Sequence, residues 1–241
     1  MRSSVLLIRV AAFLMLAMPV SLSLAAADDA DTCVKASGDE RIAACTRVID
    51  SGRWSGSGLA RAYNSRGNAY NEKGDNDRAI ADYDQAIRLD PNEPWSYVGR
   101  GKAYRLKGDY DKAIESYTRS ISVDPKYDRA YDARCYAKAI QDQLVSALAD
   151  CAESVRLNPK AWWTLDSLGF IYLKMGRFDD AIRNYGAALQ LNPKIAESLY
   201  GRGVANLKKG DQPAGTRDIA AAKLLDPNVA TTMSKYGIPV P

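Results

Sequence analysis

Apolar and small residues recur with a period of 34 residues between Ala60 and Val229, and a proline closes each period. The prolines stand at positions 91, 125, 159, 193 and 227, within the tetrapeptides LDPN, VDPK, LNPK, LNPK and LDPN. Self-similarity at this period is typical of stacked helix-turn-helix units. The pattern therefore predicts five repeats, at residues 60–93, 94–127, 128–161, 162–195 and 196–229.

Within each repeat, small residues occupy two aligned positions and aromatic residues surround them. The eighth position holds Gly67, Gly101, Cys135, Gly169 and Gly203, and the twentieth holds Ala79, Ala113, Ala147, Ala181 and Gly215. Minimal side chains let the two helices of a hairpin cross closely. Tyrosines at the eleventh and twenty-fourth positions, such as Tyr70 and Tyr83, are expected to fill the core beside the crossing.

The turn residues agree with this division into helices. The segments KGDND, KGDYD, MGRFD and KGDQP place a glycine at the end of the first helix, where a left-handed residue is favoured. Three of these four segments continue with an aspartate that is suited to cap the second helix. The Asp or Asn before each proline is disfavoured in helical geometry, so the second helix should stop there.

These repeats resemble the tetratricopeptide repeat (TPR) family. Segments such as YNSRGNAYNEKGDNDRAIADYDQAIRLDPN show the family's small eighth residue, aromatic eleventh, alanine twentieth, aromatic twenty-fourth and proline thirty-second. The third repeat departs from the pattern at Cys135, Lys138 and Cys151, and the fifth departs at Asn206 and Ile219. The resemblance implies an all-α, right-handed α-solenoid that binds proteins.

The flanking segments extend this organisation. Residues 28–59 match a shortened hairpin from Asp29 to Ile49, followed by a Gly/Ser-rich loop from Ser51 to Gly58. Residues 230–241 are expected to form a C-terminal cap and tail, with a short helix between Asn228 and Lys235 and the final YGIPVP extended. Terminal units of such arrays are commonly atypical, because they have a neighbour on one side only.

Residues 1–27 have the layout of a secretory signal peptide. Arg2 and Arg9 precede or flank an apolar run, and three alanines end at Ala27, the predicted cleavage position. A membrane anchor is the alternative, but Pro19 breaks the run and its apolar part is short of the ~20 residues of a spanning helix. We therefore expect a secreted, periplasmic protein without a stable membrane anchor after signal cleavage.

Composition and charge exclude several classes of function. The chain is 46% hydrophobic and 26% charged, which is typical of a core-forming protein, and the predicted mature part has a net charge of +2. No Lys/Arg block is present, so nucleic acid is not an expected partner. The acidic groups at Asp179 and Asp180 and from Asp82 to Asp84 are expected to be solvated helix faces.

The sequence contains four cysteines and no histidine. In an exported protein the cysteines favour disulfides, and four cysteines allow three pairings. Cys135 and Cys151 flank the turn of the third repeat, and Cys33 and Cys45 flank a turn in the first hairpin. With helix axes ~8 to 10 Å apart and Cα radii of ~2.3 Å, facing Cα atoms would lie within disulfide reach. We expect Cys33–Cys45 and Cys135–Cys151 bonds, each stabilising by roughly 3 kcal/mol.

No enzymatic chemistry is expected. The absence of histidine removes Ser-His and Cys-His nucleophile systems and most zinc sites, and no phosphate-binding loop is present. A thiol-redox role is the alternative for the cysteines, but no Cys-x-x-Cys motif occurs. The predictions are therefore no catalytic residue, no metal and no cofactor.

The concave face of such a solenoid is lined by the first helix of each repeat, at its second, fifth, ninth and twelfth positions. These positions predict a protein- or peptide-binding groove that contains Arg61, Asn64, Asn68, Asn71, Trp95, Lys102, Arg105, Arg129, Tyr136, Trp163, Phe170 and Tyr200. Val98, Asp132, Asp166, Glu197, Val204 and Leu207 fall on the same stripe. The clamp that family members use for a carboxylate is not reproduced, because Asn64 stands in place of a lysine and Gly99 in place of an asparagine.

The sequence thus predicts a non-enzymatic adaptor of the cell envelope that binds a protein segment in its groove. Three alternatives remain open at this stage. They are a self-assembling structural element, an envelope thiol-redox protein, and a glycan-binding protein that uses Trp54, Trp95 and Trp163. Neither the partner nor the oligomeric state follows from the sequence.

Overall fold

A computed structural model describes residues 20–238 of the chain. This part of the chain forms thirteen α-helices and no strands. The helices are α1 (Val20–Lys35), α2 (Gly38–Asp50), α3 (Gly56–Glu72), α4 (Asn76–Leu89), α5 (Pro94–Lys107), α6 (Tyr110–Val123), α7 (Asp128–Ile140), α8 (Leu144–Leu157), α9 (Trp162–Lys174), α10 (Phe178–Leu191), α11 (Ala196–Lys208), α12 (Gln212–Leu225) and α13 (Val229–Lys235). The predicted all-α solenoid is therefore confirmed.

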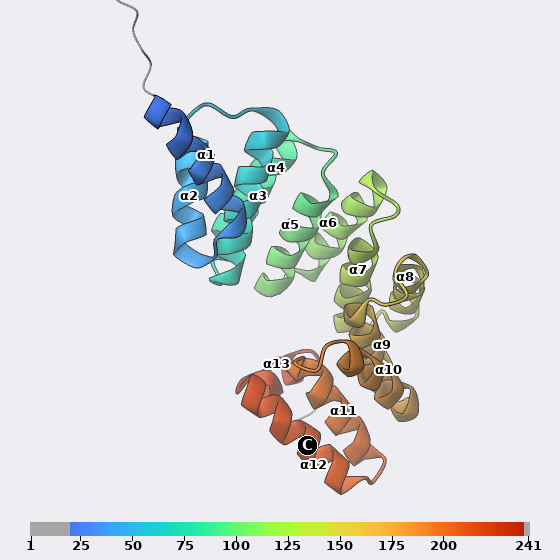
Figure 1. Cartoon of the computed structure of the whole chain (residues 1–241). Coiled ribbons are helices and arrows are strands. Elements are labelled where there is room, and N and C mark those ends of the chain that lie inside the picture. Colours follow the sequence, from blue (N-terminus) through green and yellow to red (C-terminus); the bar gives the residue numbers. More distant parts are fainter. Residues whose placement is uncertain (1–19, 239–241) are drawn as a thin grey trace, which may run out of the picture.

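Successive helices pair into hairpins, and the hairpins stack into an arc (Figure 1). The first helix of each hairpin contacts the first helix of the next, along the series α3, α5, α7, α9 and α11. These helices therefore line the inner face of the arc, and α4, α6, α8, α10 and α12 lie outside them. The short helix α13 contacts α11 and α12 and lies on the inner side of the arc (Figure 1).

Small residues allow the close helix crossings, as the repeat pattern predicts. A Cβ atom placed on Gly101 would lie 2.5 Å from Cε1 of Tyr117, which is 1% exposed. A Cβ atom placed on Gly169 would likewise lie 2.6 Å from Cδ1 of Tyr185. The tyrosine ring of the second helix therefore fills the space that a side chain on the first helix would take.

The turn glycines have the left-handed conformation that the sequence predicts, with φ of +79° at Gly74, +85° at Gly108, +71° at Gly176 and +92° at Gly210. The side chains of Asp75, Asp109 and Asp211 accept a hydrogen bond from the first turn of the following helix. In the third repeat the turn residue is Asp142, with φ of 60°. Aspartate is among the non-glycine residues that tolerate this region.

Mostly buried bidentate ion pairs join the two helices of three hairpins. The guanidinium of Arg66 donates to both carboxylate oxygens of Asp82 at 2.8 Å, and Arg134 and Arg202 form equivalent bidentate pairs with Asp150 and Asp218. The expectation that Asp82 belongs to a solvated face is wrong, because this residue is 5% exposed. A buried carboxylate needs such a partner to offset the loss of hydration.

Two disulfides lie within hairpins. The Cα atoms of Cys33 and Cys45 are 4.6 Å apart, and those of Cys135 and Cys151 are 5.5 Å apart. These are the pairs that the repeat positions predict. All four cysteine side chains are buried.

The ends of the described segment differ from the simple repeat. Helix α1 is continuous through Ala27, whereas most of the predicted signal peptide, residues 1–19, lies outside the described residues. No helix between residues 20 and 238 is long and apolar enough to cross a membrane. The tail is not extended at its start, because Gly237 has φ of +86° and returns the chain so that Ile238 is 2% exposed. The last three residues of the predicted tail also lie outside the described range.

Candidate functional site

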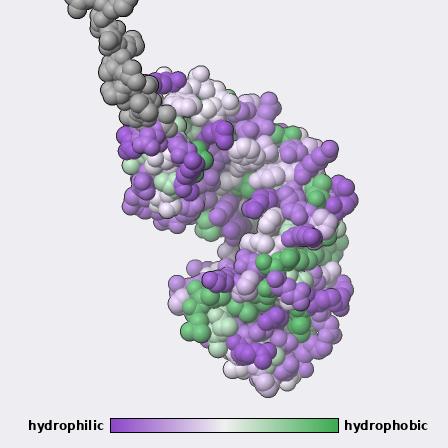
Figure 2. Space-filling model, viewed as in Figure 1, coloured by the Kyte–Doolittle hydropathy of each residue, from purple (hydrophilic) through white to green (hydrophobic). Residues whose placement is uncertain are grey.

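The inner face of the arc contains a hollow of about 550 Å³, which we call the central groove. Side chains from α5, α6, α7, α9, α11 and the α13 segment line it. It corresponds to the indentation between the two halves of the molecule in Figure 2. Its volume is in the range of sites that bind ligands or peptide side chains.

Four of the predicted groove residues meet in the central groove: Lys102, Arg105, Tyr136 and Trp163. Asp132, Asp166 and Glu197, from the same predicted stripe, also line it. The first helices of repeats two to five therefore contribute to one surface. This arrangement follows from the contacts between α5, α7, α9 and α11.

A second hollow, of about 140 Å³, lies near the N-terminal end of the array, and we call it the N-terminal pocket. It contains Arg61, Asn64, Asn68 and Trp95, as predicted for the first two repeats. The two asparagines are already engaged, since Asn64 Nδ2 donates to Ser96 Oγ at 2.9 Å and Asn68 Nδ2 donates to Asn64 Oδ1 at 3.2 Å. Asn68 Oδ1 also accepts from Tyr83 Oη at 2.7 Å.

Three predicted groove residues are not on the surface. Phe170 is 1% exposed, Tyr200 is 0% exposed and Asn71 is 7% exposed. The ring of Phe170 packs 5.2 Å from that of Tyr136, and Tyr200 belongs to the core cluster that includes Val229 and Met233 of the C-terminal segment. The assignment of these residues to a binding surface is therefore wrong, because neighbouring helices cover them.

Arg129 is exposed but does not line either hollow. Its guanidinium carbon lies 4.3 Å from the centroid of a Trp163 ring. This cation–π contact restricts the indole on the rim of the central groove. Arg129 thus helps to position Trp163, which lines the central groove.

The C-terminal segment contributes residues that the repeat pattern does not identify. Tyr236 and Thr232 line the central groove, although the sequence predicts only a cap and a tail there. The Tyr236 ring is 6.0 Å from that of Tyr136 in an edge-on arrangement, and Tyr236 Oη accepts a hydrogen bond of 3.4 Å from Arg105. Tyr117, which the repeat register assigns to the core, and Trp162, for which the register predicts no role, also line the groove.

Two carboxyl groups of the central groove are strongly perturbed by burial. Ser167 Oγ donates to Asp132 at 2.8 Å, and Ser198 Oγ donates to Asp166. Burial raises the pKa of Asp132 to about 6. Burial, with the charges of Glu197 and Asp132, raises the pKa of Asp166 to about 7.

The basic side chains of the groove are on α5. Burial, together with the nearby charge of Arg105, lowers the pKa of Lys102. The Arg105 guanidinium lies 5.4 Å from the centroid of the Tyr136 ring. Lys102 and Arg105 lie on the same side of the groove, because they are one helical turn apart.

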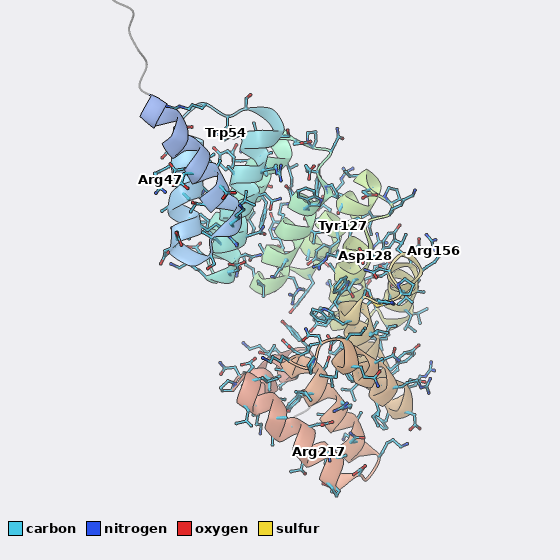
Figure 3. The ribbon with its side chains drawn as sticks, viewed as in Figure 1. Arg47, Trp54, Tyr127, Asp128, Arg156 and Arg217 are labelled. Atoms are coloured by element: carbon cyan, nitrogen blue, oxygen red, sulfur yellow. A yellow bond between two sulfur atoms is a disulfide. The ribbon has the colours of Figure 1, made fainter. Side chains whose placement is uncertain are left out.

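The tryptophans do not form one platform. Trp54 is in the loop between α2 and α3 at the N-terminal end of the array (Figure 3), where it lines a separate hollow with α1 and α3. Trp95 lines the N-terminal pocket and Trp163 lines the central groove. The three indoles of the proposed glycan-binding alternative therefore belong to three different hollows.

Comparison with known families agrees with this geometry. A family model described as TPR repeat matches residues 67–108 and 153–210, and one described as tetratricopeptide repeat matches residues 94–127. The chain is a TPR protein. TPR proteins are in general scaffolds for protein–protein interaction that perform no catalysis.

Solved structures with a similar fold are also TPR proteins. The structure titled "Crystal structure of YrrB: a TPR protein with an unusual peptide-binding site" has a TM-score of 0.50 and 21% identity, and the match covers 79% of this chain and 97% of that one. A crystal structure of MamA protein has a TM-score of 0.52 and 26% identity, with 71% and 94% covered. The APC/C hetero-tetramer Cut9–Hcn1 has a TM-score of 0.74 and 18% identity, with 90% of this chain and 42% of that chain covered. No curated protein matches the chain significantly.

Proposed function

We propose that this TPR protein is a non-enzymatic adaptor that binds a segment of a partner protein in its central groove. The observation that carries the proposal is a hollow of about 550 Å³ on the inner face, lined by aromatic and charged side chains from four successive repeats. Aromatic side chains supply contact area with little loss of conformational freedom, and they are enriched at interaction hot spots. A curved, rigid groove can present such anchors to an extended segment without any covalent step.

We further propose that the adaptor works in the cell envelope after export. The signal-like residues 1–27 support this, as do the two buried cysteine pairs, because disulfides persist in oxidising compartments. Expression of the full chain in a bacterium, followed by fractionation and intact mass measurement, tests this part. We expect a periplasmic protein that begins at Asp28 and has no free thiol; an uncleaved cytoplasmic product would contradict export.

A pull-down tests the binding proposal. The bait is the oxidised mature protein, and the groove variant is Trp95→Ala plus Trp163→Ala, which removes one anchor from each hollow. We expect a partner from envelope extract to be retained by the wild type and lost from the variant. Circular dichroism and the thermal midpoint of each protein verify that the variant remains folded.

A matched variant controls for the loss of apolar surface in general. Val145 and Leu224 are 81% and 87% exposed and do not line the central groove or the N-terminal pocket. We expect Val145→Ala plus Leu224→Ala to retain the partner at the wild-type level. Equal recovery by the groove variant would refute the proposal, as would equal loss with the control variant.

A further inference from the structure

The central groove contains several charged side chains that lack an ion-pair partner in the described part of the chain. Three hairpins of the array hold mostly buried charges in ion pairs, namely Arg66–Asp82, Arg134–Asp150 and Arg202–Asp218. Within residues 20–238, the five charged groups of the central groove take part in no ion pair within 4 Å. These groups are Lys102, Arg105, Asp132, Asp166 and Glu197. The groove therefore presents charges that the fold itself does not neutralise.

These charges are separated by sign along the array. Lys102 and Arg105 are on α5, whereas Asp132, Asp166 and Glu197 are on α7, α9 and α11. Burial raises the pKa of Asp132, and the charges of Arg129 and Arg105 act against this effect. The charges of Glu197 and Asp132 add to the effect of burial in raising the pKa of Asp166. The groove thus has a basic end at α5 and an acidic end at α9 and α11.

Tyr136 on α7 lies between the two ends, and Trp163 lies on α9, at the acidic end. Tyr136 contacts Arg105 on one side and the rings of Phe170 and Tyr236 on the others, so its position is restricted. Trp163 is restricted by Trp162 and by Arg129. An occupant would meet the basic end, then the restricted Tyr136 ring, and then the acidic end with the Trp163 indole.

We infer that the occupant of the central groove is an extended protein segment of mixed charge, with an acidic side chain at the α5 end and a lysine or arginine at the α9–α11 end. The inference rests on the proposed function and names the chemistry of its partner. Neighbouring first helices pack roughly 8 to 10 Å apart, so α5 and α9 are separated by roughly 16 to 20 Å. An extended chain rises about 3.3 Å per residue, so the two charges of the partner should be about five residues apart.

The test uses fluorescein-labelled peptides of nine residues on a neutral Ser/Gln background, with both ends blocked. One peptide carries Glu and Lys five residues apart, two carry only one of these charges, and one carries neither. Fluorescence anisotropy at low salt, at a pH above the raised pKa values of Asp132 and Asp166, measures their affinities for the oxidised mature protein. We expect the mixed-charge peptide to bind at least about tenfold more tightly than the neutral one, and the singly charged peptides to lie between them.

Two substitutions show whether each end of the groove binds the peptide side chain of opposite charge. Lys102→Gln should weaken binding of the Glu-containing peptides severalfold and leave the peptide with Lys alone unchanged. Asp166→Asn should weaken binding of the Lys-containing peptides severalfold and leave the peptide with Glu alone unchanged. Lys209→Gln and Asp179→Asn are matched controls, because these two residues pair with each other outside the groove, and they should change none of the affinities.

Several outcomes would overturn the inference. Equal affinity for all four peptides would show that the groove does not distinguish peptides by their charge. If a peptide with Glu alone or Lys alone binds as tightly as the mixed peptide, only one end of the groove contributes to charge recognition. No saturable binding of the mixed peptide up to about 1 mM would also overturn it. These results leave the pull-down unaffected, so failure of the inference is distinguishable from failure of the proposed function.

Discussion

Gly101→Ala tests whether close helix crossings depend on the missing side chain. Gly101 lies in α5, where the new Cβ would be 2.5 Å from Cε1, 2.8 Å from Cδ1 and 2.9 Å from Cζ of Tyr117. The Tyr117 ring is 1% exposed and is packed in a cluster with Val98, Tyr104 and Ile114. It cannot move away without shifting these neighbours. The strain must therefore open the hairpin of α5 and α6 or distort its core.

Two opposing contributions determine the expected change in the free energy of unfolding of Gly101→Ala. Overpacking a core typically costs about 1 to 3 kcal/mol or more, and three ring atoms closer than 3.0 Å place this site at the upper end. Alanine is favoured over glycine inside a helix by about 1 kcal/mol, which offsets part of the cost. We expect Gly101→Ala to lower the free energy of unfolding by about 2 kcal/mol.

Gly186→Ala is the matched control. Gly186 is also inside a helix, α10, but a Cβ placed on it would have no atom within 4 Å. Only the helix preference then acts, so this variant should be more stable by about 0.5 to 1 kcal/mol. Urea unfolding followed by circular dichroism, under oxidising conditions, measures both variants. If Gly101→Ala were neutral or as stabilising as Gly186→Ala, the packing explanation of the small eighth position would be refuted.

Three further predictions concern the disulfide, a buried ion pair and the groove acids. Cys135→Ala plus Cys151→Ala should lower the free energy of unfolding by about 3 kcal/mol, because the bond closes a loop with a sequence separation of 16. Asp150→Asn should cost about 3 to 5 kcal/mol, since it leaves two basic side chains in a mostly buried site without a carboxylate. Asp166→Asn should stabilise the protein above pH 7 and have little effect near pH 3.8. The sign follows because the folded state, with the raised pKa, keeps a proton that the unfolded state releases within this window, so stability falls as pH rises through it.

Urea titrations measure all three effects, the last one at both pH values. Added reductant should lower the free energy of unfolding of the wild type more than that of the cysteine variant, because the variant retains only the Cys33–Cys45 bond. A neutral effect of Asp150→Asn would show that its two basic partners reach water when the carboxylate is removed. A constant effect of Asp166→Asn at both pH values would show that the carboxyl group is solvated in the folded state.

The elements that the sequence predicts correctly depend on residues that are close along the chain. The 34-residue period identifies the hairpins, and the turn glycines from Gly74 to Gly210 have the expected left-handed backbone. Cys135 faces Cys151 for the same reason, because both belong to one hairpin whose two helices must cross at their small residues. Short-range geometry of this kind repeats in every unit, so the register of one repeat predicts that of the others.

The outcome for the groove residues is different. Lys102, Arg105, Tyr136 and Trp163 lie on one surface as predicted, but Phe170 is covered by its neighbours. Position in the repeat indicates which way a side chain points, and it does not indicate what the next hairpin or α13 places over it. A non-repeating helix at the end of an array has no register from which its contacts could be inferred.

The sequence by itself determined the repeat unit, its turns and the stripe of residues that faces inward. Only the tertiary structure decided how these stripes combine, because the curvature of the array is the sum of small rotations between successive hairpins. That curvature brings Tyr236 to within hydrogen-bond distance of Arg105, 131 residues earlier in the chain. It also leaves the basic end and the acidic end of the central groove facing one space without an ion pair between them.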